Sequence, residues 1–295
     1  MRILITGSNG MLGSDLVAEL APYEICGLDR HNNRHSQIQY EQVDITDRTA
    51  VLKAVTLLKP SIIVHAAAFT DVDECELNPT QAFSVNSKGT QWVAEAGDSC
   101  GATLFFMSTD YVFDGTKQLP YNEEDKPNPL SVYGRSKFQA EEFLKSKCRS
   151  SWILRTSWLF GMNGKNFFRT IAQLAREKKE LRIVDDQRGV PTYTKDLAKA
   201  IRILIERGSR AKGYHLYHIA NTGETTWFQA AKKFLEKTCP DIKLIPISSQ
   251  ELNRPAKRPL NSVFNMERIK KDFGIQLRRW DEALLQFQSE VLKKE

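Results

Sequence analysis

The first half of the chain alternates short apolar segments with longer stretches of helical spacing. Short apolar runs are typical of buried strands, and apolar positions three or four apart are typical of helices. The pattern predicts strands at residues 2–6, 24–29, 61–65, 103–108 and 152–156, and helices at residues 11–20, 51–58, 82–100 and 133–145. Because strand–helix repetition joins parallel strands through crossover helices, we expect an α/β fold with a doubly wound parallel sheet of the Rossmann type.

The alternation loosens after Trp158. The remaining pattern predicts a loop at residues 115–129, a turn-rich segment at 185–191, a strand at 214–220, and helices at 166–176, 194–205, 226–238, 266–273 and 281–292. We expect a dinucleotide-binding domain of residues 1–156 and 190–222. A smaller, mainly C-terminal substrate domain would comprise residues 157–189 and 223–295, and a return of the terminal helix to the first domain is left open.

Composition narrows the classes of function. The 295 residues are 41% hydrophobic and 26% charged, as in an ordinary soluble globular protein. The net charge of +6 is spread among acids with no basic, aromatic face, so we expect no nucleic-acid partner, although the charge suits phosphate-bearing ligands. No apolar run approaches the roughly 20 residues of a membrane span, so we expect no membrane partner. Five scattered cysteines and an N-terminus unlike a signal peptide favour a cytoplasmic location.

The first predicted strand runs into a turn that contains three glycines and opens a helix. One glycine makes the tight bend, a second lets the backbone approach a pyrophosphate, and a third lets helix and strand pack closely. The helix N-terminus then presents free N–H groups to the phosphates. An ordinary strand–helix turn is the alternative, but the position after the first strand favours a dinucleotide site. The expected cofactor residues here are Gly7, Asn9, Gly10, Met11, Leu12 and Gly13.

The spacing Gly-x-x-Gly-x-x-Gly is typical of extended short-chain reductases. Asp29 closes the next predicted strand, where its carboxylate would bind the free 2′-hydroxyl of NAD, whereas Arg30 could hold the 2′-phosphate of NADP. We therefore expect use of NADH or NADPH, with the preference undecided. Asp44 and Ile45 follow another short strand, where this class contacts the adenine; a helix N-cap at Asp44 or Thr46 is the alternative.

Tyr133 and Lys137 form a Tyr-x-x-x-Lys pair. Positions four apart on a helix share a face, so the ammonium can lie beside the phenol. A cation there would bring the pKa of Tyr133 down from about 10 toward neutrality, as a general acid or base requires. A plain Tyr–Lys contact on an exposed helix is the alternative. Catalysis is favoured because Thr109 ends a predicted strand at the carboxyl edge of the sheet, where its hydroxyl could donate to a carbonyl oxygen.

Taken together, these residues resemble the dTDP-4-dehydrorhamnose reductase family of extended short-chain dehydrogenases/reductases. The resemblance runs almost end to end, through residues 5–13, 64–76, 107–115, 133–137, 154–161, 166–168, 185–192 and 254–261. It implies NAD(P)H-dependent reduction of the C4 ketone of dTDP-4-dehydro-L-rhamnose to dTDP-L-rhamnose, a precursor of cell-surface polysaccharide. Thr109, Tyr133 and Lys137 would be the catalytic residues, with Tyr133 as the proton donor.

The resemblance also implies residues around the cofactor and the nucleotide sugar. Ala66, Ala67 and Ala68 would line the nicotinamide side. Asn86 would complete a proton relay, with a polar residue on a helix flank as the alternative. The substrate would be surrounded by Thr70, Asp71, Thr109, Trp158, Asn166, Phe167 and Arg258. A core position for Trp158 and an ordinary surface charge for Arg258 are the alternatives.

Two groups of possible metal ligands are better explained otherwise. The acids Asp71, Asp73, Glu74 and Glu76 would stabilise a helix start through its dipole. His215 and His218 lie three apart in a predicted strand, so they face opposite sides and are expected to be structural. Some relatives hold a divalent ion at a dimer interface, but only Asp15 matches here. We therefore expect no metal site, and leave a Mg²⁺ requirement open.

Other functions would use the same general motifs. A reductase or epimerase of another nucleotide sugar would share the glycine turn and the Tyr–Lys pair. A non-catalytic regulatory subunit, like the related partner of methionine adenosyltransferase, is a different class, against which the intact Thr109–Tyr133–Lys137 set argues. The sequence leaves a monomer or a homodimer open.

Overall fold

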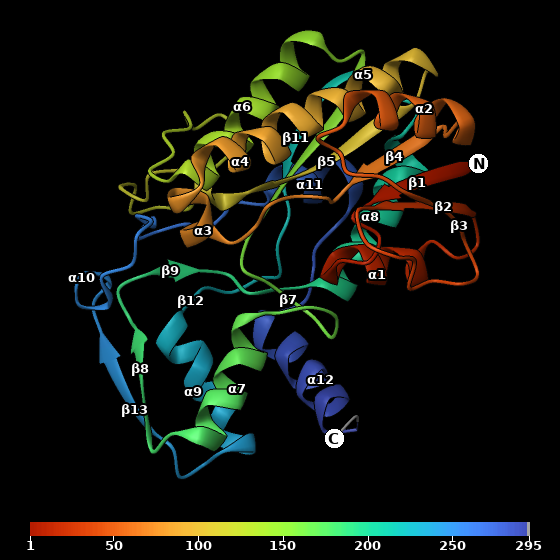
Figure 1. Cartoon of the computed structure of the whole chain (residues 1–295). Coiled ribbons are helices and arrows are strands. Elements are labelled where there is room, and N and C mark those ends of the chain that lie inside the picture. The colour runs from red at the N-terminus through yellow and green to blue at the C-terminus, as the bar shows by residue number, and fades with distance from the viewer. Residues whose placement is uncertain (294–295) are drawn as a thin grey trace.

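The computed structural model describes residues 1–293, and its central feature is a seven-stranded sheet (Figure 1). The strands run in the order β11-β6-β5-β4-β1-β2-β3, and every neighbouring pair is parallel. They are β1 (Arg2–Thr6), β2 (Glu24–Asp29), β3 (Gln39–Gln42), β4 (Ile62–His65), β5 (Thr103–Thr109), β6 (Ser150–Thr156) and β11 (Gly213–His218). The order reverses between β1 and β4, which places a crevice for ligands at the carboxyl ends of these strands. The predicted doubly wound Rossmann fold is confirmed.

Helices cover both faces of the sheet (Figure 1). One face carries α2 (Arg48–Leu58), α5 (Thr90–Ser99) and α6 (Val132–Lys147), and the other carries α1 (Met11–Glu19), α8 (Thr194–Gly208) and α11 (Glu267–Phe273). Successive strand residues face opposite sides, so Leu4 and Ile63 pack under the first group of helices while Ile3 and Val64 pack under the second. Burial on both faces explains why these strands are apolar throughout rather than alternating.

A second lobe packs around its own apolar core below the sheet in Figure 1. It contains α7 (Phe167–Glu177), α9 (Trp227–Thr238) and α12 (Trp280–Leu292), with β8 (Glu180–Val184) paired in parallel to β13 (Lys243–Ile247). Phe168, Phe234 and Phe287 are fully buried in this core. Helix α12 therefore packs in the second lobe. The exact domain boundaries stay a prediction.

Shorter elements complete the chain. They are α3 (Val72–Leu77), η2 (Asp110–Val112), β7 (Leu159–Phe160), β9 (Arg188–Gly189), β10 (Thr192–Tyr193), β12 (Thr225–Thr226) and α10 (Ser249–Leu252). The pairs β7–β10 and β9–β12 form small two-stranded sheets. Strands β8 and β13 were not predicted because exposed charged residues, such as Arg182 and Lys243, interrupt their apolar pattern.

The single helix predicted over residues 82–100 is wrong in detail. The chain forms α4 (Pro79–Phe83), then a π-helical segment η1 (Ser84–Gly89), and only then α5. Periodicity does not reveal this insertion, because the helical direction continues through it. Gly89 lies where a Cβ atom would come within 2.9 Å of the Ile45 side chain, so the wider turn passes close to the segment after β3. π-helical turns are frequent at functional sites, and this one carries Asn86.

Candidate active site

The glycine turn follows β1 as predicted. Gly7 has a φ of 70°, a conformation that favours glycine, and its carbonyl accepts a hydrogen bond of 2.9 Å from the N–H of Gly10. A Cβ atom on Gly13 would lie 2.0 Å from the Gly7 oxygen, so only glycine allows this packing. Helix α1 begins at Met11 with no side-chain cap. Its N-terminal N–H groups therefore face the crevice, and the turn fits a pyrophosphate.

Asn9 connects this turn to the loop between β2 and β3. Its backbone N–H donates to the Asp29 carboxylate at 3.2 Å, its amide Nδ2 donates to the carbonyl of Asn32 at 3.0 Å, and its amide oxygen accepts from the N–H of Arg34 at 3.1 Å. Arg30 and Arg34 are exposed and line the same cavity as Asp29. Among residues 1–293, neither arginine forms an ion pair with a carboxylate. The loop therefore presents two positive charges near Asp29.

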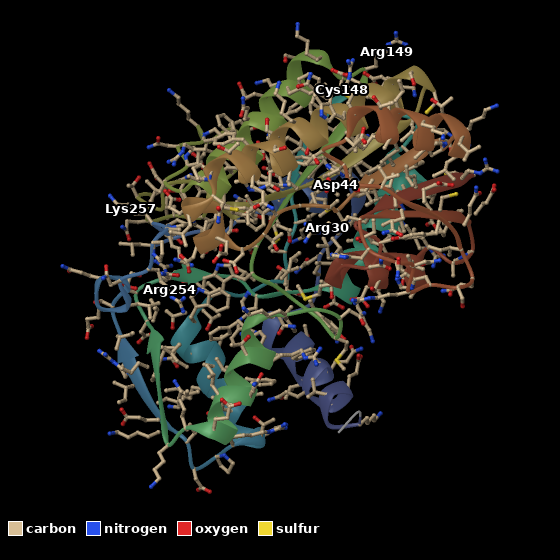
Figure 2. All side chains as sticks on the ribbon, viewed as in Figure 1. Arg30, Asp44, Cys148, Arg149, Arg254 and Lys257 are labelled. Atoms are coloured by element: carbon tan, nitrogen blue, oxygen red, sulfur yellow. The ribbon has the colours of Figure 1, made fainter. Side chains whose placement is uncertain are left out.

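Asp44 and Ile45 follow β3 and line the cavity too. Asp44 accepts hydrogen bonds from the N–H and hydroxyl of Thr46, at 2.9 and 2.8 Å. The N-cap of α2 is Asp47, whose carboxylate accepts from the N–H of Ala50 at 3.0 Å, so the alternative of a cap at Asp44 or Thr46 is wrong. Asp44 and Arg30 also line an adjoining cavity of about 520 Å³, and Figure 2 shows them beside each other.

One cavity of about 650 Å³ brings together the predicted catalytic residues and the glycine turn. Thr109 ends β5 and Lys137 lies inside α6; both are buried, at 5% and 2% exposure. Tyr133 is held in the first turn of α6, whose N-cap Ser131 accepts a hydrogen bond of 3.2 Å from Gly134. The Thr109 side chain lies near the phenol of Tyr133. Ala66, Ala67 and Ala68 line the same cavity.

Burial controls the ionisation of the Tyr–Lys pair. It raises the pKa of Tyr133 above its ordinary value, and the nearby Thr109 hydroxyl offsets this only in part. The expectation that Lys137 brings the phenol toward neutrality is therefore wrong for this structure. Burial also lowers the pKa of Lys137 to about 7, against the opposing charge of Glu141. The Lys137 ammonium lies 4.0 Å from the centroid of the Phe106 ring, a cation–π contact.

Two residues after Thr109 belong to the same site but were not predicted as site residues. Asp110 is 2% exposed; its Oδ1 accepts from the Thr109 hydroxyl at 3.1 Å, and burial raises its pKa to about 6. Tyr111 lines the cavity, and its ring meets the Tyr133 ring edge-on at 5.7 Å between centroids. Both directly follow the end of β5, and a position after a strand end was a sequence signal for site residues. The sequence did not show, however, that the η2 turn directs these two side chains toward the site.

Thr70 and Trp158, predicted to contact substrate, line the cavity. Trp158 is half-buried, has an unusual φ of 46°, and stacks on Trp227 with 3.7 Å between ring centroids. Trp158 is therefore not a core residue. Trp227 also lines the cavity but was missed, since a tryptophan at the start of a helix carries no sequence signal of its own.

Four other predicted substrate residues lie outside the cavity lining. Asp71 caps α3 by accepting from the N–H of Glu74 at 3.2 Å, and Asn166 caps α7 by accepting from the N–H of Arg169 at 3.2 Å. Phe167 packs on Trp227 at 4.5 Å between centroids. Arg258 forms an ion pair with Asp73 at 2.9 Å, so it is not an ordinary surface charge. Their contact with substrate stays a prediction.

Asn86 joins three segments of the site. Its amide oxygen accepts from the N–H of Phe69 at 2.8 Å, and its Nδ2 donates to the Phe69 carbonyl and to the Ser136 hydroxyl, each at 3.0 Å. At 1% exposure, it is more than a polar residue on a helix flank. It ties η1 and α6 to the loop after β4.

The candidate metal ligands have other partners. In the part of the chain that the structure describes, no group of three or more His, Cys, Asp or Glu side chains could hold a metal ion. Asp15 accepts a hydrogen bond from the Thr194 hydroxyl. His215 stacks on Trp152 at 4.3 Å, and His218 is fully buried against Phe264 at 4.2 Å. No described helix is long and apolar enough to cross a bilayer.

A parallel sheet with a glycine turn after its first strand, and a Thr–Tyr–Lys group in the adjoining cavity, defines an extended short-chain dehydrogenase/reductase. Comparison with known families narrows this class: the model described as RmlD substrate binding domain matches residues 1–293. The chain belongs to this family, that of the dTDP-4-dehydrorhamnose reductases.

Its relatives align along nearly the whole chain. A dTDP-4-dehydrorhamnose reductase from Sinorhizobium fredii is 38% identical, covering 96% of this chain and 95% of the relative. The spore coat polysaccharide biosynthesis protein SpsK from Bacillus subtilis is 36% identical, and the alignment covers 98% of this chain and 97% of the relative. Among solved structures, the dTDP-4-dehydrorhamnose reductase from Bacillus anthracis, crystallised in complex with NADP, has 37% sequence identity and a TM-score of 0.89. The match covers 98% of this chain and 99% of that chain. A UDP-glucose 4-epimerase from Thermotoga maritima, at 21% identity and a TM-score of 0.85, shares the fold alone.

Proposed function

We propose that this protein reduces the C4 ketone of dTDP-4-dehydro-L-rhamnose to dTDP-L-rhamnose with NAD(P)H, and that Tyr133 donates the proton. The observation that carries the proposal is the meeting of Thr109, Tyr133 and Lys137 in one cavity with the glycine turn. The substrate is inferred from relatives named dTDP-4-dehydrorhamnose reductase along nearly the whole chain.

The residues around the cavity suit a nicotinamide dinucleotide. The turn formed by residues 7–13 would hold the pyrophosphate on the N-terminus of α1, and Asp29 would bind a ribose hydroxyl. Asp44 and Ile45 would flank the adenine, while residues 66–68 and Lys137 would lie on the nicotinamide side. When bound, NAD(P)H supplies the hydride.

Thr109 and Tyr133 act on the ketone oxygen. With substrate bound, both hydroxyls would donate hydrogen bonds to it, Thr109 in place of its bond to Asp110, and these would strengthen as negative charge develops on that oxygen. The raised pKa of Tyr133 keeps its proton in place until the oxygen becomes basic enough to take it. Lys137 lies one helical turn along α6, where its ammonium would bind the ribose of the nicotinamide.

We expect apolar residues to contact the deoxysugar and mainly polar residues to contact the outer part of the substrate. The stacked rings of Trp158 and Trp227 offer a flat apolar wall for the deoxysugar, beside Thr70. Asp71, Asn166, Phe167 and Arg258 would surround its outer part. The net positive charge favours a ligand that carries a diphosphate.

We infer a preference for NADPH over NADH, because Arg30 and Arg34 place positive charge beside the ribose position. Arg34→Ala and Arg30→Ala are each expected to weaken NADPH binding by roughly tenfold or more and to change NADH binding little, since each removes a charge-assisted contact to the 2′-phosphate. Fluorescence titration of both cofactors measures this. Lys53→Ala, which removes an exposed charge on α2, is the control. An equal loss for NADH and NADPH would contradict the assignment.

The direct test of the function is NADPH oxidation with the dTDP-4-keto-6-deoxy sugar made by its upstream enzymes, followed by identification of the sugar product. Rapid oxidation that yields dTDP-rhamnose supports reaction and substrate together. An epimerase of nucleotide sugars would retain bound NAD and show no net oxidation. A regulatory subunit would bind cofactor without turnover and co-purify with a synthetase.

A further inference from the structure

The second lobe contacts the catalytic half of the molecule through residues 254–258, which lie against α3. Asp73, in the first turn of α3, accepts two hydrogen bonds from this segment and lies near a further arginine. Nη2 of Arg258 donates to its carboxylate at 2.9 Å, the N–H of Ala256 donates at 3.2 Å, and the guanidinium of Arg254 lies 3.5 Å away. The Asp73 carboxylate thus binds three residues of the segment.

The ion pair between Asp73 and Arg258 is largely shielded from water. Each side chain is only 18% exposed, so the pair is screened less than a surface pair would be. Burial by itself would raise the pKa of Asp73, but the hydrogen bond and charge of Arg258 hold it below its ordinary value. Arg254 and Lys257 carry their charges on the outside of the same segment, at the left of Figure 2.

Arg258 also reaches toward the proton donor. Its guanidinium lies near the hydroxyl of Tyr111, and its Nη1 donates to the carbonyl of Ala256 at 3.0 Å. The ring of Tyr111 meets that of Tyr133 edge-on, at 5.7 Å between centroids. A Cβ atom on Gly134 would lie 2.2 Å from the Tyr111 carbonyl oxygen, so the start of α6 packs directly on this residue. The contacts are continuous from Asp73 to Tyr133.

We propose that Asp73 is a positioning residue for this reaction. It orients Arg258, and through it Tyr111, so that residues 254–258 stay in place against α3 and the Tyr133 ring keeps its position in the cavity. This inference rests on the proposed reduction at Tyr133. Asp73 lines no part of the cavity itself and acts only through these neighbours.

Asp73→Asn tests the proposal, because it keeps the size of the side chain and an acceptor for the N–H of Ala256 but removes the charge. We expect the KM for the dTDP-linked keto sugar to rise by roughly tenfold or more and kcat to fall severalfold, since a charged hydrogen bond is lost. The Kd of NADPH should stay within about twofold, because Asp73 lies outside the cofactor side of the cavity. Glu74→Gln removes a charge from the next position of α3 and should leave all three constants within about twofold.

Tyr111→Phe provides a second, independent variant. It should raise the KM for the keto sugar, as Asp73→Asn does. The KM of the double variant Asp73→Asn/Tyr111→Phe should rise no more than about that of the more affected single variant, because both changes act through Arg258. Unchanged KM and kcat in Asp73→Asn would overturn the proposal. If Asp73→Asn also lowered the NADPH affinity and the melting temperature in parallel, the proposal would be overturned, because Asp73 would then only stabilise the fold.

Failure of the proposed function is distinguishable from failure of this inference. If the wild-type protein turns over no keto sugar, calorimetric binding of dTDP decides the role of Asp73 without turnover. Weaker dTDP binding by Asp73→Asn than by Glu74→Gln supports the inference, and equal binding overturns it.

Discussion

Tyr133→Phe is expected to lower turnover by about a thousandfold, because the phenol is the proposed proton donor. The ring itself stays, so the edge-on contact with Tyr111 and the packing of α6 are retained. The Kd of NADPH should therefore remain within about twofold of the wild-type value. Steady-state turnover of the keto sugar, together with a fluorescence titration of NADPH, measures both quantities.

The matched control is Tyr23→Phe, which removes a phenol that donates to Glu206 at 2.7 Å outside the cavity lining. It should leave turnover unchanged. Near-normal turnover in Tyr133→Phe would show that another group supplies the proton. Asp110 would then be the first candidate, since it lies beside Thr109 and burial raises its pKa to about 6.

Glu141→Gln is expected to have the largest effect on stability, lowering the free energy of unfolding by about 3–5 kcal/mol. Glu141 forms a two-point ion pair with Arg155, at 2.6 and 3.0 Å, and the two side chains are 2% and 3% exposed. The variant leaves the buried Arg155 charge without its ion-pair partner. Denaturant unfolding monitored by fluorescence measures the change.

Glu180→Gln breaks an exposed pair with Lys243, at 3.4 Å, and serves as the comparison. It should change the free energy of unfolding by less than about 1 kcal/mol, since solvent screens the pair. Adding Arg155→Met to Glu141→Gln should recover part of the lost stability, because no charge then remains unpaired. If Glu141→Gln and Glu180→Gln lowered the free energy of unfolding equally, burial would not explain the effect of Glu141→Gln.

The buried pair also bears on the active site. The Ser108 hydroxyl hydrogen-bonds Glu141, so the carboxylate joins the end of β5 to α6. Thr109 follows Ser108, and Lys137 precedes Glu141 by one helical turn. The catalytic strand and the catalytic helix therefore share one anchor, which the sequence did not reveal because Ser108, Glu141 and Arg155 match no motif.

Several features were determined by the sequence alone, because they depend on neighbours along the chain. Alternation of apolar strands and helices predicted the parallel sheet, and three glycines at fixed spacing predicted the turn before α1. The four-residue spacing of Tyr133 and Lys137 predicted that they share one face of a helix. In each case local backbone geometry decides which side chains lie together.

Only the tertiary structure decided the rest. Asp73 and Arg258 are 185 positions apart, and Trp158 stacks on Trp227 from a distant part of the chain. The pKa of Tyr133 is raised rather than lowered because burial, which depends on packing, outweighs the effect of the nearby Thr109 hydroxyl. Spacing along a chain specifies contacts within one element; contacts between elements, and the loss of water around a charge, follow only once the lobes have packed.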